Sequence, residues 1–143
     1  RELVPHSIVD NGLRWHVRAF DRKSDSFRDF VLTRISKVTI KDTPNEEESA
    51  HSDTEWQHMI PLQLVPHPKN IQHPTAIEMD YGMENSQLLI NVRAAMAGYL
   101  LRRWNVDCSE RGTLEGAEYQ LWLQNRFTLN DVKNLAIAPG YLK

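Results

Sequence analysis

The side chains best suited to chemistry lie in residues 14–20, which read RWHVRAF and alternate strictly between nitrogen-bearing and apolar residues. Successive side chains of a β-strand point to opposite faces, so Arg14, His16 and Arg18 would share one face of an extended strand. Guanidinium and imidazole groups donate hydrogen bonds, and a row of them is suited to binding an anion. The stretch therefore predicts a half-buried strand whose open face binds a small anion or one short stretch of a polyanion.

Further polar residues before and after this strand extend the predicted site. Arg28 and Arg34 keep one parity along the next strand, so they would flank the same face if the strands pair in simple register. A serine hydroxyl can donate to a phosphate oxygen. A surface arginine can instead cover apolar neighbours with its stem, but several basic residues so close together favour a binding site. The predicted ligand-binding residues are Ser7, His16, Arg18, Arg28 and Arg34, with His6, Asn11 and Arg14 as further members.

Other kinds of site find little support in the sequence. The remaining histidines have no metal-ligand spacing, and the single cysteine, Cys108, has no evident base partner. A Gly-rich phosphate loop, a nucleophile elbow and a His-Glu-x-x-His motif are all missing from the sequence. We therefore expect a protein that is not an enzyme and that uses no metal and no cofactor.

Composition restricts the class of protein further. The 143 residues carry a formal net charge of −2, which argues against a broad nucleic-acid-binding face and for a local anion site. One cysteine leaves no intrachain disulfide and fits a reducing compartment. The sequence has no apolar run long enough to cross a bilayer. We expect a cytoplasmic protein without a membrane partner.

The first forty residues predict a small β-meander or barrel. Short strands are expected at residues 3–9, 13–20, 27–33 and 35–40, with a turn at Asp10–Gly12 and a polar loop at 21–26. Residues 41–55 read KDTPNEEESAHSDTE and contain almost nothing apolar, which favours a flexible linker. Alternatively, the acidity of this segment could screen the basic row nearby.

After residue 55 the pattern predicts an α+β unit of ferredoxin-like type. Strands are expected at residues 58–65, 76–80 and 88–92 and a helix at 93–104. A short stretch of alternating apolar residues follows at 119–125, and a last helix is expected from Thr128 to about Ala138. Two arginines in the last turn of the 93–104 helix suit the helix dipole better than they suit a DNA contact. The expected domains are thus 1–42, an acidic linker at 43–57, and 58–143.

Several segments together resemble a known family of bacterial proteins. Residues 1–6 (RELVPH), 14–21 (RWHVRAFD), 27–30 (FRDF) and 32–35 (LTRI) resemble the WYL domain of bacterial transcriptional regulators. The letters that name the family fall on Trp15, His16 and Val17, so only the tryptophan is kept. Residues 61–68, 78–83 and 119–125 resemble the family's C-terminal extension, the WCX domain. With the closing LAIAPGY, the chain is most similar to regulators of phage-defence loci of the BREX and CBASS type.

This resemblance implies a fold and a function. It implies an Sm-like, SH3-type β-barrel that senses a nucleotide-like or nucleic-acid ligand through basic residues on one face. By position, Ser7, His16, Arg18, Arg28 and Arg34 match the family's ligand-facing residues. It also implies a homodimer, with the C-terminal extension helping dimerisation and signal relay. Operator DNA would be read by an N-terminal helix-turn-helix that is not among these residues.

We therefore expect the effector-sensing and dimerisation portion of a DNA-binding transcriptional regulator, most simply a repressor. The barrel could lack its first strand, in which case missing N-terminal residues or a second copy would complete it. One alternative is a protein-interaction module whose barrel face binds an acidic segment of a partner. Another is direct binding of single-stranded nucleic acid, which predicts length-dependent affinity and a steep dependence on salt.

Overall fold

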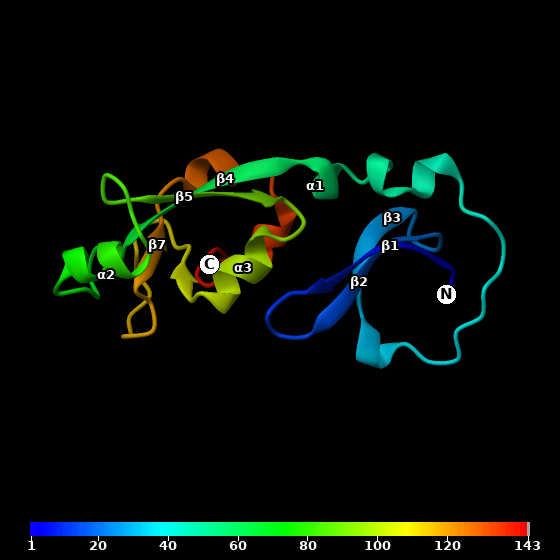
Figure 1. Cartoon of the computed structure of the whole chain (residues 1–143), viewed down its shortest axis with the longest axis horizontal. Coiled ribbons are helices and arrows are strands. Elements are labelled where there is room, and N and C mark those ends of the chain that lie inside the picture. Colours follow the sequence, from blue (N-terminus) through cyan, green and yellow to red (C-terminus); the bar gives the residue numbers. More distant parts are fainter. Residues whose placement is uncertain (143) are drawn as a thin grey trace. The chain divides into compact units, whose positions relative to one another are not determined.

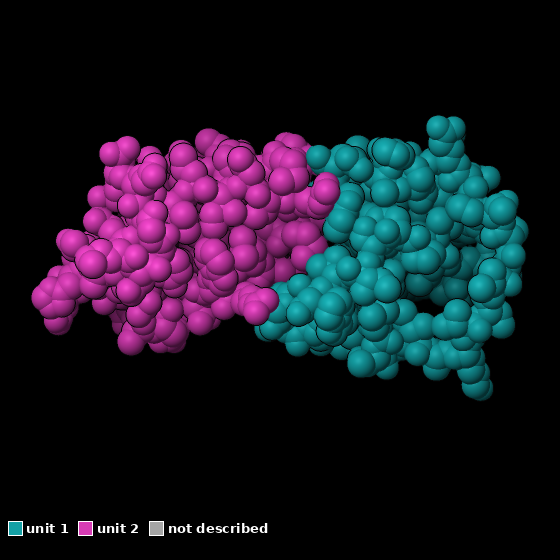
Figure 2. Space-filling view, viewed as in Figure 1, with its two compact units in different colours: residues 1–57 teal, residues 58–143 magenta. Residues whose placement is uncertain are grey.

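The computed structural model describes residues 1–142 and divides into two compact units, residues 1–57 and a second unit that begins at His58 (Figure 2). Each unit has its own sheet, and the helices are few and short, so the chain is of mixed α+β content (Figure 1). Within the described residues, no helix has both the length and the apolar character needed to cross a membrane.

Unit 1 is built on a three-stranded antiparallel sheet in the order β1-β2-β3. Its strands are β1 (Leu3–Asp10), β2 (Trp15–Asp21) and β3 (Ser26–Val31). The first turn forms because the Asn11 side chain accepts the backbone N–H groups of Leu13 and Arg14, while Gly12 adopts a φ of 86°. These three strands and the turn between the first two are confirmed.

The fourth predicted strand, residues 35–40, is wrong. A single 3-10 turn at Leu32–Arg34 follows β3, and residues 35–45 form neither helix nor strand. Ile40 is 97% exposed, so β-branched residues alone do not make a strand where no neighbouring backbone pairs with them. Within the described residues, the sheet of unit 1 is open, and the Sm-like barrel is not confirmed.

Residues 43–57 belong to unit 1 and differ from the flexible linker that their composition predicts. They form two 3-10 turns, Glu46–Glu48 and Ala50–Ser52, followed by the short helix α1 (Thr54–Gln57). The first turn begins with a capping box in which Asn45 and Glu48 satisfy each other's backbone N–H groups. Glu48 and Asp53 are buried despite the acidic surroundings in the sequence.

Unit 2 is organised around a four-stranded sheet in the order β5-β4-β7-β6. Its elements in chain order are β4 (Met59–Pro66), α2 (Pro74–Asp80), β5 (Leu88–Arg93), α3 (Ala97–Arg103), β6 (Val106–Asp107) and β7 (Leu121–Leu123). Strands β6 and β7 pair in parallel, and the other pairs are antiparallel. This chain order, β-α-β-α-β-β, differs from the β-α-β-β-α-β order of a ferredoxin-like unit, so that arrangement is not confirmed.

The core of unit 2 is aliphatic. Fully buried leucines from the central strands, from α3 and from the C-terminal segment pack together. These residues are Leu62, Leu64, Leu101, Leu121, Leu123 and Leu135. Gly98 lets α3 approach the C-terminal segment closely, and its backbone N–H donates to the Asn134 side chain at 2.6 Å.

Three predictions for unit 2 need correction. Residues 76–80 are part of helix α2 and not a strand, because Pro74 at the first helical position already has the backbone φ of a helix. The helix predicted at 93–104 begins only at Ala97, since Arg93 still pairs with Met59 across the sheet. The last predicted helix is a pair of 3-10 helices, Arg126–Leu129 and Lys133–Ile137.

A buried histidine and aspartate fix the loops beside β6. His67 Nδ1 accepts the backbone N–H groups of Lys69 and Asn70, so the proton of the neutral ring is on Nε2, which donates to Asp107 at 2.9 Å. Asp107 also accepts backbone N–H groups from Ser109 and Leu114. The pair is thus fully used in holding loops. The neighbouring Cys108 is buried, and burial raises the pKa of its thiol well above the usual range.

Candidate anion-binding site

The sheet of unit 1 brings polar side chains from its strands to one face. Arg18, in the central strand β2, lies opposite Ser7 on β1 and opposite Asp29 on β3. Residues that are directly opposite in antiparallel strands point to the same face. The register shifts between Pro5 and Ser7, an irregularity at the position of His6.

Arg18 is the centre of the site, and each nitrogen of its guanidinium donates at least one hydrogen bond. Its Nε and Nη2 donate to the two oxygens of Asp53 at 2.8 and 3.0 Å, a bidentate pair. Nη2 also donates to Glu55 at 3.0 Å, and Nη1 donates to Asp29 at 3.2 Å. The side chain is buried, with only 4% of the residue exposed, so its charge is compensated by carboxylates and hardly at all by water.

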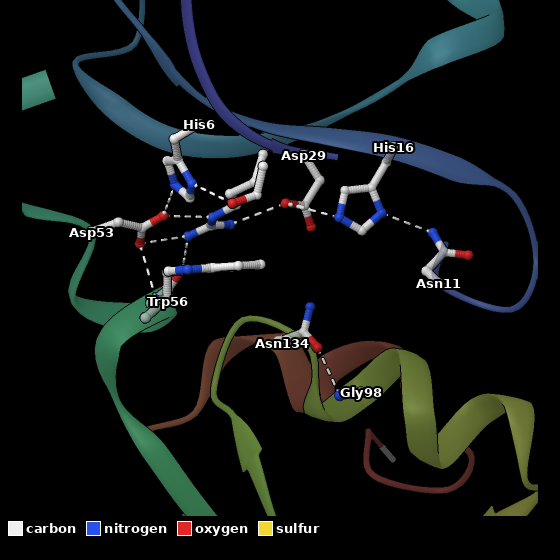
Figure 3. A network of polar contacts seen from close by, with 11 residues as sticks. His6, Asn11, His16, Asp29, Asp53, Trp56, Gly98 and Asn134 are labelled. Atoms are coloured by element: carbon white, nitrogen blue, oxygen red, sulfur yellow. Dashed lines mark hydrogen bonds and ion pairs between the residues drawn. The ribbon is translucent and has the colours of Figure 1, made fainter. Parts of the chain in front are cut away.

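His6 completes the surroundings of Asp53. Its Nε2 lies 3.0 Å from Asp53 Oδ2 (Figure 3). Its Nδ1 lies 2.8 Å from the Ser7 hydroxyl. The imidazole makes edge contacts with the rings of Trp56 and Phe27, at centroid distances of 5.3 and 5.8 Å. The backbone N–H of Trp56 donates to Asp53 Oδ1 at 3.2 Å, so the carboxylate is held from several directions.

His16 lies farther along the same strand face and is almost fully buried. The Asn11 carbonyl oxygen already accepts two backbone N–H groups, so the amide nitrogen is the atom 3.0 Å from His16 Nδ1, and it donates. Nε2 then carries the proton of the neutral ring and lies 3.6 Å from Asp29 (Figure 3). Burial lowers the pKa of His16 and outweighs the opposing effect of Asp29.

The charges of the site reinforce one another. Burial by itself would raise the pKa of Asp53, but the hydrogen bonds from Arg18 and His6 outweigh it, and the pKa lies below its usual range. Burial likewise opposes the charged form of Arg18, yet its hydrogen bonds to Asp53 and the charge of Asp29 raise the pKa of the guanidinium. Both groups therefore remain ionised in the folded chain.

A second arginine holds residues 46–57, the acidic segment, nearer its start. Arg22, which directly follows β2, donates from Nε and Nη2 to the two oxygens of Glu48 at 2.8 and 2.9 Å. These bonds, together with the backbone N–H of Asn45, lower the pKa of Glu48 to about 2. Two arginine forks thus fix residues 48–55 to the sheet of unit 1.

The structure brings together five of the eight predicted site residues. These are His6, Ser7, Asn11, His16 and Arg18. Arg28 lies opposite Ala19 and therefore on the other face of the sheet, because the register places Asp29, not Arg28, beside Arg18. Arg34 lies in the 3-10 turn after β3 and Arg14 precedes β2, and both are exposed.

The basic row is also less open than its alternation predicts. Trp15, expected on the buried side of the strand, is 55% exposed, whereas His16 is only 1% exposed. Sequence reasoning missed the acidic partners of the row, which are Asp29, Asp53 and Glu55. The signal that could have found them is the acidity of residues 41–55, which suggested screening of the row as the less favoured alternative. Residues 1–142 contain no cluster of histidine, cysteine and acidic side chains arranged to hold a metal ion.

The two units match different protein families. The model of the WYL domain matches residues 1–40. The model of the C-terminal dimerization domain of the BrxR transcriptional regulator matches residues 59–129. The chain therefore combines a WYL domain with a C-terminal dimerization domain of the BrxR type. Its WYL domain carries the arginine site, and its BrxR-type dimerization domain lies in unit 2.

Several relatives of this WYL protein share the name "DNA-binding transcriptional repressor CapW". The one from Pseudomonas aeruginosa is 35% identical over 133 residues, which is 92% of this chain and 44% of the relative. One from Escherichia coli is 37% identical over 127 residues, or 88% and 42%. One from Stenotrophomonas maltophilia is 32% identical over 106 residues, or 73% and 35%. The chain spans less than half the length of these relatives.

Proposed function

We propose that this chain is the effector-sensing and dimerisation portion of a DNA-binding transcriptional repressor of the phage-defence type, and that its effector is a nucleotide-like or nucleic-acid anion. The observation that carries the sensing role is the fork of the buried Arg18, which with the partly buried His6 and Ser7 forms a set of groups for anion oxygens. The repressors named CapW and the BrxR-type dimerization domain support the regulatory role.

In this proposal the two units have different tasks. The sheet of unit 1 forms part of an Sm-like barrel whose basic face receives the ligand. Unit 2 joins two copies into a homodimer, and operator DNA is bound by a helix-turn-helix in the longer protein. A ligand that binds one state of the dimer better than the other shifts the population of states, and the shift changes how the operator is held.

A second candidate function is favoured by a specific observation. The site already holds carboxylates from a peptide segment, those of Asp53 and Glu55. A partner protein with an acidic segment could satisfy the same donors, which would make unit 1 a protein-interaction module. The two functions differ in which anion binds, a phosphate-bearing molecule or an acidic peptide.

The test is a thermal-shift screen of the chain against mononucleotides, cyclic nucleotides, short single-stranded DNA and an acidic peptide. A ligand that binds only the folded state at one hundred times its Kd stabilises it by about 2.7 kcal/mol, which gives a measurable rise in Tm. The Arg18→Lys variant keeps the charge but loses the fork, so the rise should shrink. The control variant Arg111→Lys makes the same exchange at an exposed position of unit 2 and should retain the full rise.

The outcomes separate the candidate functions. A rise with nucleotides that depends on Arg18 supports the sensor, and a rise that grows with DNA length and falls steeply with salt points to single-stranded nucleic acid as the ligand. A rise with the acidic peptide alone identifies the interaction module. The absence of any rise that depends on Arg18 rejects ligand sensing at this site.

A further inference from the structure

We propose that residues 46–57, the acidic segment, occupy the anion site of their own chain, and that the Asp53 carboxylate takes the place of a phosphate group of the ligand. This inference rests on the proposed function and adds to it a chemical class and a regulatory step. The ligand would be a phosphate ester, and its binding would release the acidic segment from the sheet.

The first support is the geometry around Asp53. An arginine fork binds carboxylate and phosphate in the same bidentate manner, through two parallel N–H groups. Arg18 offers such a fork to Asp53 at 2.8 and 3.0 Å, and His6 Nε2 adds a contact of 3.0 Å to one of the same oxygens. The donors therefore surround two oxygens of one anionic group, and a phosphate presents at least two oxygens with similar spacing.

The second support is the origin of the carboxylates in the chain. Asp29 is on β3 and stays beside Arg18 as part of the sheet. Asp53 and Glu55 are 35 and 37 residues away from Arg18, on a segment that reaches the site only after the exposed residues 36–45. The fixed carboxylate of Asp29 accepts from only one nitrogen of Arg18, and the carboxylates of the acidic segment accept from the other two.

The third support is energetic. Removal of the carboxylate from a buried arginine strongly destabilises the folded state, so Asp53 is not expected to leave Arg18 unless another anion replaces it. When a phosphate replaces the carboxylate, however, Arg18 exchanges one bidentate anion for another and is never left uncompensated. The acidic segment is also attached through the fork of Arg22 on Glu48, which shares no partner with Arg18 and does not compete with a ligand there.

Release of the acidic segment would have a direct consequence for unit 2. Gln57 ends helix α1, and β4 begins two residues later at Met59. The segment that fills the anion site is therefore also the connection into the dimerization domain. Displacement of Asp53 would free this connection, and that gives a physical route from ligand binding to the dimer.

The first experiment measures the affinity for adenosine monophosphate by isothermal titration. In the variant Asp53→Asn/Glu55→Gln the competing charges are removed, so the affinity should rise at least about tenfold if the segment occupies the site for more than nine-tenths of the time. The control Glu46→Gln/Glu47→Gln removes the same net charge from exposed positions of the same segment and should leave the affinity within about twofold of the parent chain.

The second experiment needs no substitution and so remains valid if the variant folds poorly. The Trp56 backbone N–H is bonded to Asp53, and the Gln57 N–H is bonded to the Asp53 carbonyl. Both amides should exchange with solvent faster when adenosine monophosphate is bound to the parent chain. Amides within β2 serve as internal controls and should not change.

The results separate this inference from the proposed function. Tighter binding in the variant or faster exchange at Trp56 supports self-occupancy. Binding that depends on Arg18, with neither tighter binding nor faster exchange, overturns self-occupancy and leaves the sensor intact. No binding of adenosine monophosphate to the parent chain or the variant overturns the phosphate site, and with it the nucleotide-sensing part of the proposed function.

Discussion

Arg18 shows how one side chain can connect distant parts of a small unit. Its fork joins the central strand to a carboxylate on β3 and to two carboxylates from the acidic segment. A lysine could supply the charge, but its single ammonium cannot donate two parallel hydrogen bonds to one carboxylate. The identity of this residue therefore matters to the structure of the free protein as well as to the proposed ligand.

The ion pair between Glu48 and Arg22 gives a prediction for the dependence of stability on pH. The pKa of Glu48 is about 2 in the folded chain and near 4.5 without its partners, so the folded state holds this carboxyl ionised where the unfolded state has begun to protonate it. The resulting stabilisation is complete above about pH 4.5 and is lost as pH falls toward 2. Urea unfolding across this window should show a steeper loss for the parent chain than for Glu48→Gln.

The control for this measurement is Glu47→Gln, the neighbouring exposed carboxylate. It should follow the parent chain throughout the acid range. If Glu48→Gln also followed the parent chain, the ion pair with Arg22 would not be formed in solution.

For the individual residues of the site, the sequence predicts only part of the arrangement. Alternation placed His16 and Arg18 on one face because parity along a single strand is a local property. It failed for Arg28, because which residue lies opposite Arg18 depends on strand register, and the register is set by the turn between β2 and β3. It could not place Asp53, since contacts between residues far apart in the chain leave no periodic pattern.

Helix α3 and the C-terminal 3-10 helix Lys133–Ile137 approach each other closely at Gly98. Gly98 on α3 faces the backbone carbonyl of Asn134 and the side chain of Ile137 so closely that a Cβ atom would overlap with both. The Asn134 side chain accepts the Gly98 N–H, which α3 itself cannot bond so near its first turn. This contact joins the C-terminal segment of the chain to α3.

Gly98→Ala should therefore destabilise unit 2. In an exposed helix the same change stabilises by about 1 kcal/mol through helix propensity, but here the added methyl group would push against backbone. Overpacking of this kind costs about 1–3 kcal/mol, which denaturant unfolding would detect. Arg102→Ala, at an exposed position of the same helix, should change stability by less than about 0.5 kcal/mol. Equal stability of Gly98→Ala and the parent chain would mean that the two helices separate in solution.

The elements that sequence reasoning found are those with a strong local pattern, such as β1, β2 and β4. The errors concern short segments whose form depends on partners. Residues 35–40 have strand propensity but no strand beside them. Residues 76–80 form a helix because the segment is short and Pro74 at its first position favours helical backbone angles. The parallel pairing of β6 with β7 joins strands of two and three residues, too short for a recognisable pattern.

For the whole molecule, the two units differ in how they are stabilised. Unit 2 has a continuous aliphatic core, whereas unit 1 has few buried apolar side chains, Val17 and Ala19 among them. Its arginine forks connect the acidic segment to the sheet. Hydrophobic burial contributes most of the stability of a domain, and ion pairs contribute less. Unit 2 should therefore be the more stable of the two.

A fragment of residues 58–143 should fold by itself. We expect a cooperative thermal transition by circular dichroism and, from the proposed role of unit 2, a dimer in analytical ultracentrifugation. A fragment of residues 1–57 should show no such transition, because its apolar core is too small. A fragment 58–143 that lacked a cooperative transition would show that the two units fold only as one.

The position of Cys108 has a consequence for the redox chemistry of the protein. Thiols react as thiolates, and this sole cysteine is both enclosed by unit 2 and held in its protonated form. Oxidants and alkylating reagents therefore reach it only when the unit opens, so the rate of its modification reports how often unit 2 opens. The same burial prevents two native copies from being joined through a disulfide bond, and oxidative stress should leave the folded protein chemically unchanged at this residue.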